Sequence, residues 1–126
     1  MTIKEVSAIT GLTPDTLRYY ERIGLLPNIR RTASGIRDYD DNAINWIEFI
    51  KCMRSAGLTL ETLIEYVTLF YQGEATQERR KSILIEQRRL LAERIKAMQE
   101  TLSKLDAKIE HYESIMFPAE EKLRNA

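Results

Sequence analysis

The residues of this chain that could do chemistry are donors suited to anions, and several of them gather in one short stretch. In TPDTLRYYERIGLLP, residues 13 to 27, Arg18 follows Thr16 and precedes Tyr19 and Tyr20. The guanidinium of Arg18 presents a fork of N–H donors that matches phosphate oxygens or the edge of guanine. Each tyrosine can place a hydroxyl on a phosphate while its ring packs. This stretch therefore favours the binding of a polyanion over bond-breaking chemistry.

Two short helices joined by a glycine turn are expected to position these donors. Thr13 should cap a second helix that begins at Pro14, and Gly24 should end it. A first helix, capped by Thr2, precedes the turn at Gly11. The pair predicts a helix-turn-helix whose second helix enters the major groove of DNA. The apolar residues of the first helix that should face the core are Ile3, Val6 and Ile9.

A basic hairpin is expected next, in NIRRTASGIRDY, residues 28 to 39. A polar turn around Ser34 separates two short strands. No acid lies within residues 28 to 37, so Arg30, Arg31 and Arg37 should form a local basic patch that contacts phosphates. An ordinary solvated hairpin is the alternative, and three unbalanced arginines argue against it.

Two further helices should complete the core of this domain. The third runs from Asp40 to Gly57, and Thr59 should cap the fourth, which ends near Gly73. Arg54 stands off the apolar face of the third helix, just before the turn, and is a further candidate for a phosphate contact. The apolar faces comprise Ala43, Trp46, Ile47, Phe49, Ile50 and Met53 on the third helix, and Leu60, Leu63, Ile64, Val67, Leu69 and Phe70 on the fourth.

A charge-rich helix without glycine or proline is predicted from Glu74 to Phe117, where Pro118 should stop it. Its apolar residues alternate at spacings of four and three, which is the pattern of a coiled coil, broken only by Arg88. Such a helix spans roughly 50 Å and cannot bury its seam on so small a domain, so we expect it to pair with a second copy of the chain. The heptad pattern leaves the orientation of the pair open. The seam residues are Leu84, Leu91, Ile95, Met98, Leu102, Leu105, Ile109, Tyr112 and Met116.

Composition sets limits on the class of protein. The 126 residues are 44% apolar and 30% charged, with 19 basic and 19 acidic side chains, so the chain is neither disordered by composition nor basic overall. No apolar run approaches the roughly 18 residues of a membrane span, and the first residues do not resemble a signal peptide, so a cytoplasmic location is expected. One cysteine excludes an internal disulfide.

Enzymatic chemistry is not expected. No paired acid and base, no nucleophile with its base and no phosphate-binding loop is apparent, and no metal site or cofactor is predicted. We therefore predict an all-α, mainly helical fold. It comprises a winged helix-turn-helix DNA-binding domain over residues 1–72, a coiled-coil dimerisation helix over 74–117 and a polar tail over 118–126.

Two runs in the sequence, TIKEVSAITGLTPDTLRYYERIGLL and RRTASGIRDYDD, closely resemble the amino-terminal DNA-binding domain of MerR-family transcription regulators. The resemblance covers roughly residues 1 to 72, and the long helix fits the family plan. It implies that Tyr39 contacts phosphate, that the turn after Arg54 acts as a second wing, and that the dimer helices pair antiparallel. It also implies promoter DNA and RNA polymerase as partners, because members of the family activate promoters by distorting the DNA. The predicted DNA-contacting residues are Thr13, Thr16, Arg18, Tyr19, Tyr20, Arg30, Arg31, Ser34, Arg37, Tyr39 and Arg54.

Cys52 carries a second implication of the resemblance. A short, thiol- and aldehyde-responsive subgroup of the family has a lone cysteine in the third helix, as this chain does. Cys52 falls at the edge of the apolar face, so simple packing is the alternative role. Lys51 and Arg54 would favour a thiolate, and Glu48 would oppose it.

The leading hypothesis is therefore a homodimeric DNA-binding transcription regulator triggered by an aldehyde or another electrophile at Cys52. One alternative is a regulator that senses a small molecule non-covalently near the dimer helix. The other is an adaptor that binds proteins through its coiled coil.

Overall fold

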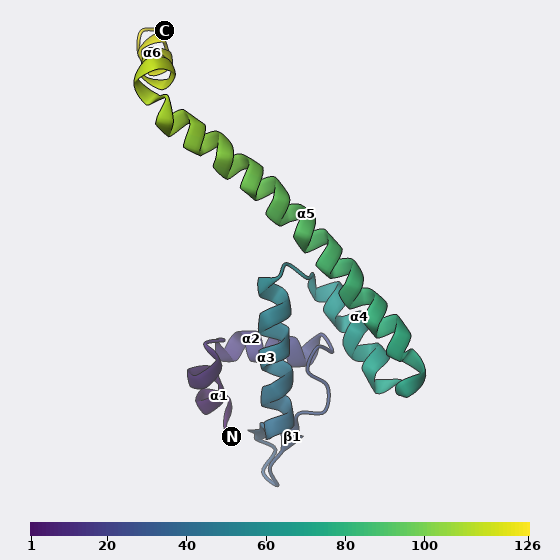
Figure 1. Ribbon diagram of the computed structural model, residues 1–126. Helices are drawn as coiled ribbons and strands as arrows, with labels where there is room; N and C mark the ends of the chain where they lie inside the picture. Colours follow the sequence, from purple (N-terminus) through teal and green to yellow (C-terminus); the bar gives the residue numbers. More distant parts are fainter. The chain divides into compact units, whose positions relative to one another are not determined.

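A computed structural model describes residues 1–126, which divide into two compact units, Met1–Gln87 and Arg88–Ala126. The first unit contains the helix-turn-helix, a small hairpin and two further helices, as drawn in Figure 1. The second contains most of the long helix and a short carboxyl-terminal helix. The chain is mainly helical, as predicted. No helix is both long and apolar enough to cross a lipid bilayer.

The first two helices begin and end where the sequence predicts. Helix α1 spans Ile3–Thr10 behind a capping box, in which Thr2 and Glu5 exchange side-chain and backbone hydrogen bonds. Gly11 closes α1 in the left-handed conformation, with a φ of 78°. Helix α2 spans Pro14–Arg22, with Thr13 as its amino-terminal cap. Predicted caps and breakers therefore set both helices of the motif.

The prediction that Ile9 of α1 faces the core is wrong. Val6 is fully buried, but Ile9 is more than half exposed. At about 100° per residue, Thr10 lies about 40° round the helix from Val6, and Ile9 lies about 60° round it in the opposite sense. Thr10 takes the buried place because its hydroxyl donates to the Val6 carbonyl at 2.7 Å, which satisfies its polar group within the helix.

The hairpin forms a two-stranded antiparallel sheet. Strand β1 is Arg30–Arg31 and strand β2 is Arg37–Asp38, with Arg31 paired to Arg37. The Thr32 hydroxyl lies 3.0 Å from that of Ser34, and it accepts from the Ile36 backbone N–H. These contacts fix the polar turn that the sequence predicts.

Helices α3, Asp41–Ser55, and α4, Leu60–Tyr71, follow the hairpin in the first unit. Asp40 and Thr59 cap them, as predicted. The two helices share one core with α1, α2 and the hairpin (Figure 1). Its fully or almost fully buried apolar residues are Val6, Leu17, Leu25, Leu26, Tyr39, Ile47, Ile50, Leu58, Leu63 and Val67.

The first unit extends past the predicted boundary at residue 72, to Gln87. A short 3₁₀ turn, η1 (Glu74–Thr76), leads into helix α5, Gln77–Glu110. Thr76 is buried there, and its hydroxyl donates to the Leu69 carbonyl of α4 at 2.5 Å. This contact ties the start of α5 to the end of α4, which is why the first turns of α5 belong to the first unit.

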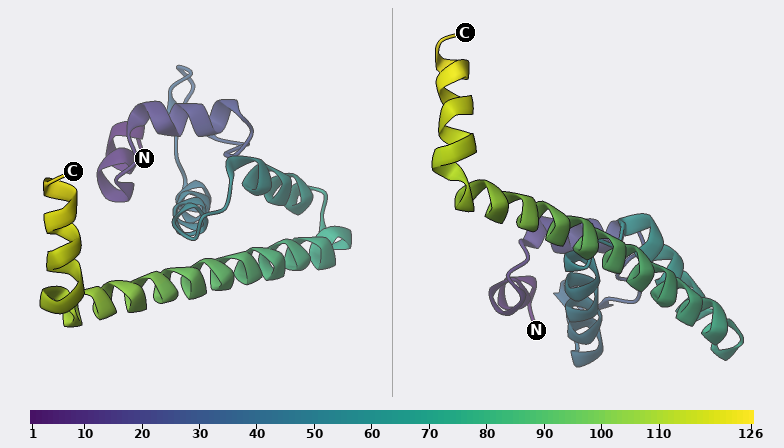
Figure 2. Two further views of the ribbon diagram at one scale, coloured as in Figure 1. Left: turned by 90° about the horizontal axis from the view of Figure 1, so that it is seen from above. Right: turned by 45° about the horizontal axis from the view of Figure 1, so that its top comes forward.

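The second unit differs from the single helix predicted up to Phe117. Helix α5 ends at Glu110, a π-helical turn, η2 (Tyr112–Met116), follows, and α6 spans Phe117–Arg124 (Figure 2). Pro118 lies in the first turn of α6, a position where a missing backbone N–H costs nothing. It therefore begins a helix rather than stopping one, and most of the predicted polar tail is helical.

The π turn changes the predicted seam near its end. From Ile95 to Ile109 the seam residues lie on α5 and are largely exposed within this chain. Tyr112 and Met116 lie in η2, where the wider turn breaks the heptad register. The Tyr112 hydroxyl instead donates to a Glu120 carboxylate oxygen at 2.5 Å. The periodicity that predicts a seam position for these two residues does not hold there.

Candidate nucleic-acid interface

Helix α2 presents the first group of predicted contact residues. Thr13 accepts from the Thr16 backbone N–H at 3.1 Å, and its hydroxyl donates to that of Thr16 at 2.9 Å. Both hydroxyls thus hold the start of the helix. Arg18 and Tyr19 are exposed, and Tyr20 is half-buried against the core. The helix therefore carries an exposed arginine and an exposed aromatic ring on a well-capped scaffold.

Arg18 forms one solvent-exposed ion pair. Its guanidinium lies 3.1 Å from a carboxylate oxygen of Asp15, whose side chain is almost fully exposed. A solvated pair of this kind contributes little stability. Breaking it to reach a phosphate or a base edge is therefore inexpensive, and Arg18 remains the side chain of α2 best suited to contact DNA.

The hairpin arginines are not unbalanced, contrary to the sequence-based expectation. Glu21 of α2 accepts from Arg37 Nε at 2.6 Å, and Arg31 Nη2 lies 3.4 Å from its second oxygen. The Glu21 side chain is only 19% exposed. An acid distant in sequence thus partly neutralises the hairpin and ties it to α2. A count of charges along residues 28–37 could not reveal this, because the acid comes from another element.

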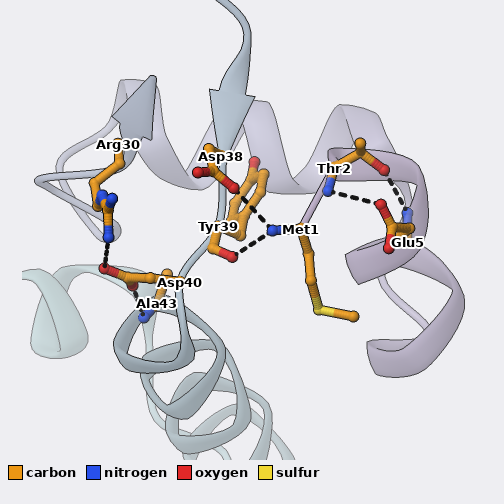
Figure 3. A network of polar contacts seen from close by, with 8 residues as sticks. All are labelled: Met1, Thr2, Glu5, Arg30, Asp38, Tyr39, Asp40 and Ala43. Carbon is orange, nitrogen blue, oxygen red and sulfur yellow. Dashed lines mark hydrogen bonds and ion pairs between the residues drawn. The ribbon is translucent and has the colours of Figure 1, made fainter. Parts of the chain in front are cut away.

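Arg30 and the start of α3 form a second polar group beside the hairpin, shown in Figure 3. Arg30 Nη1 lies 3.8 Å from an oxygen of Asp40, the residue that caps α3. The amino terminus donates to the Asp38 carboxylate at 2.9 Å and to the Tyr39 carbonyl at 2.8 Å. The hydrogen bond and charge of this amine hold the pKa of Asp38 below its usual value. Arg30 is the most exposed of the three hairpin arginines.

The Tyr39 side chain does not lie at the surface, where a contact to phosphate was expected. Its ring is buried in the core, and its hydroxyl is buried without a hydrogen-bond partner. Burial raises the pKa of Tyr39, against the effect of nearby arginines such as Arg37. The predicted phosphate contact stays a prediction, and the buried hydroxyl is a donor that no group in the chain uses.

Arg54 has a structural task in this chain. Its Nη1 donates to the Leu58 carbonyl at 2.8 Å, across the turn between α3 and α4. This contact gives a partner to a carbonyl of the turn, which lies outside both helices. Its predicted phosphate contact would use the remaining donors of the guanidinium.

Cys52 is exposed on α3 and forms no disulfide. The packing role considered for it therefore has no support within this chain. Lys51 lies 4.0 Å from a carboxylate oxygen of Glu48, so two of the three charges expected to act on the thiol partly neutralise each other. No group of three or more histidine, cysteine, aspartate or glutamate side chains is arranged to hold a metal ion.

The arrangement defines a class of protein. A capped helix with exposed donors lies against a basic hairpin that an ion-paired glutamate joins to it. This is a winged helix-turn-helix of the kind that binds double-stranded DNA.

Comparisons with known proteins agree with this class. The family model of the MerR HTH regulatory proteins matches residues 1–69, and a MerR DNA-binding model matches residues 44–108. The transcriptional regulator AdhR of Bacillus subtilis is 59% identical over 93 residues, which are 74% of this chain and 66% of AdhR. The chain thus spans about two thirds of that relative's length. HmrR of Sinorhizobium medicae is 33% identical over 79% of this chain and 68% of its own length.

Solved structures give the same result. A regulator from Listeria monocytogenes assigned to the MerR family superposes with a TM-score of 0.86, at 47% identity over 99% of this chain and 95% of its own. HiNmlR, a MerR family regulator lacking the sensor domain and solved bound to promoter DNA, superposes with a TM-score of 0.81, at 27% identity over 88% of both chains. The chain belongs to the MerR family of DNA-binding transcription regulators, and it is not an enzyme.

Proposed function

We propose that this regulator binds promoter DNA as a homodimer, with α2 of each copy in the major groove and the hairpin on the flanking phosphates. The observation that carries the proposal is the exposed Arg18 on a well-capped helix, beside a hairpin that presents Arg30 and Arg31. HiNmlR, whose structure includes promoter DNA, has a similar fold. In this arrangement Arg18 contacts base edges in the major groove, and the hairpin arginines fix the orientation of the DNA-binding domain, called the head below.

Dimer formation through α5 completes the proposal. Ile95, Met98, Leu102, Leu105 and Ile109 are all about half exposed or more within a single chain. An exposed apolar stripe on so long a helix requires a partner, and a second copy is the simplest one. By the resemblance to the family, the pair is antiparallel and presents its two heads to one operator, next to RNA polymerase.

The signal is proposed to act at Cys52. Its thiol is exposed on α3. The thiolate would add to the carbonyl carbon of an aldehyde, and the carbonyl oxygen would take up a proton to give a hemithioacetal. The added bulk on α3 would change the setting of the heads and thus the distortion of the promoter.

Binding of DNA is tested by titrating a duplex of the adjacent promoter with the full chain at several salt concentrations. Affinity should fall steeply as salt rises, and Arg18→Ala should weaken binding by about 1–3 kcal/mol. Lys122→Ala, an exposed residue of α6 in the second unit, is the matched control and should leave affinity unchanged. Full affinity in Arg18→Ala would instead favour the protein-binding adaptor.

The trigger is tested by transcription in vitro from the same promoter, with and without a small aldehyde. Wild type should respond, and Cys52→Ala should bind DNA but lose the response. Equal responses in both would remove Cys52 from the mechanism and favour a non-covalent ligand.

A further inference from the structure

A groove lined by aromatic rings lies in the first unit, between α3, α4 and the first turns of α5. Its volume is about 280 Å³, close to the smallest pockets that hold small molecules. It is lined by Trp46 and Phe49 of α3 and by Tyr66 and Phe70 of α4. None of the residues proposed to contact DNA lines it, and neither does Cys52.

The rings form an ordered cluster rather than a loose surface patch. Trp46 meets Phe49 edge-to-face at 5.5 Å between ring centroids, and it meets Phe70 at 4.9 Å and 78°. Phe49 also packs on Tyr66 at 5.3 Å. Edge-to-face packing holds the rings in place and keeps the walls of the groove preformed. A planar ligand would find aromatic walls that need no rearrangement.

Arg80 supplies a charge at this groove. Its guanidinium carbon lies 5.5 Å from the centroid of Phe70, and its Nε donates to the Thr76 hydroxyl at 3.1 Å. Thr76 is itself buried, so the arginine is fixed from both sides. Arg80 is half-buried and forms no ion pair with any carboxylate of the chain. Its terminal nitrogens are therefore held at the groove without an anion.

These contacts determine which charge a ligand of the groove should carry. An aromatic cage alone would suit a cation, but Arg80 already stacks on Phe70 and would repel a second positive charge. A neutral ring would fill the groove and leave the guanidinium without a partner. An aromatic acid satisfies both parts, because its ring packs on Trp46 and its carboxylate accepts from the arginine fork. Asn42 and Asn45 add amide groups at the same groove.

We propose that this groove binds a small aromatic carboxylate, with the ring among Trp46, Phe49 and Phe70 and the carboxylate on Arg80. The site goes beyond the electrophile response, since it needs no reaction at Cys52. The groove lies where α3 and α4 of the first unit meet the start of α5. Its ligand is thus placed to bias the link between head and dimer helix.

The sole tryptophan of the chain lines the groove, so fluorescence reports binding directly. The full chain is titrated with benzoate, and with benzamide as a neutral ligand of the same shape. Benzoate should give a saturable change, and benzamide should bind roughly tenfold more weakly or worse. Arg80→Gln should lose a similar factor for benzoate only. Arg79→Gln, the exposed neighbour on the same helix, is the matched control and should bind benzoate as wild type does.

Three results would overturn the proposal. Equal affinity of the wild type for benzoate and benzamide would show that Arg80 does not bind a carboxylate. Equal losses of benzoate affinity in the Arg79→Gln and Arg80→Gln variants, both folded by circular dichroism, would show the same. No saturable change would mean that the groove takes no aromatic acid. If acrylamide then failed to quench Trp46, the groove would be covered by the second copy of the chain. Benzoate binding by Cys52→Ala separates this site from the electrophile response.

Discussion

At the scale of single residues, Glu21 connects the recognition helix to the hairpin. Its carboxylate is mostly buried and accepts from two arginines, so removing the charge should cost stability. We expect Glu21→Gln to lower the free energy of unfolding by about 1–2 kcal/mol, measured by urea denaturation. Asp15→Asn, which breaks the exposed pair with Arg18, is the control and should change it by less than about 0.5 kcal/mol. Equal effects would mean that Glu21 does not anchor the hairpin.

A substitution of Tyr39 should affect the stability of the fold and the affinity for DNA differently. A buried hydroxyl without a partner stabilises nothing, so Tyr39→Phe should leave the free energy of unfolding unchanged or raise it by up to about 1 kcal/mol. If a phosphate takes up that hydroxyl, the same variant should bind DNA more weakly. The two are measured by urea denaturation and by titration of a promoter duplex. Unchanged DNA affinity would confine Tyr39 to the core.

At the scale of elements, the capping box of α1 should make its stability depend on pH. The Thr2 backbone N–H, and then its hydroxyl, hold the pKa of Glu5 below its ordinary value of 4.5. A carboxyl whose pKa is lower in the folded state stabilises the fold at pH values above its pKa in the unfolded chain. This stabilisation is lost as the pH falls through its pKa in the folded state. Glu5→Gln keeps a capping acceptor but cannot titrate. Its free energy of unfolding should therefore fall less than that of wild type between about pH 6 and pH 3. Glu65→Gln, on the exposed side of α4, should retain the wild-type pH dependence.

At the scale of the whole molecule, the exposed stripe of α5 predicts the assembly. Leu102 lies in the middle of this stripe and is more than half exposed in a single chain. Leu102→Glu would place a charge in the dimer seam, and sedimentation should show monomers. Lys96→Glu, on the opposite side of α5, should remain dimeric. Residues 1–87, the first compact unit, should also sediment as monomers, and a stable dimer of that fragment would contradict the role given to the rest of α5.

Local signals in the sequence predicted most of the fold. Thr13, Asp40 and Thr59 cap the helices where expected, and glycine at position 11 ends α1, because capping depends on hydrogen bonds within a few residues. The family model confirms the motif that these helices build. The prediction failed where periodicity was extended too far. Ile9 lies off the buried face, and the heptad register of the predicted seam stops after Ile109 because a π turn interrupts the helix.

The candidate interface could be predicted only in part. Residue types and spacing alone identified exposed Arg18, the basic hairpin and the free thiol of Cys52, because each is a property of a short segment. The tertiary structure alone decided that Glu21 neutralises two hairpin arginines, and that the Tyr39 hydroxyl is buried without a partner. It also brought Arg80 to the aromatic groove of α3 and α4. These contacts join elements far apart along the chain, and packing rather than local sequence sets which side chains meet.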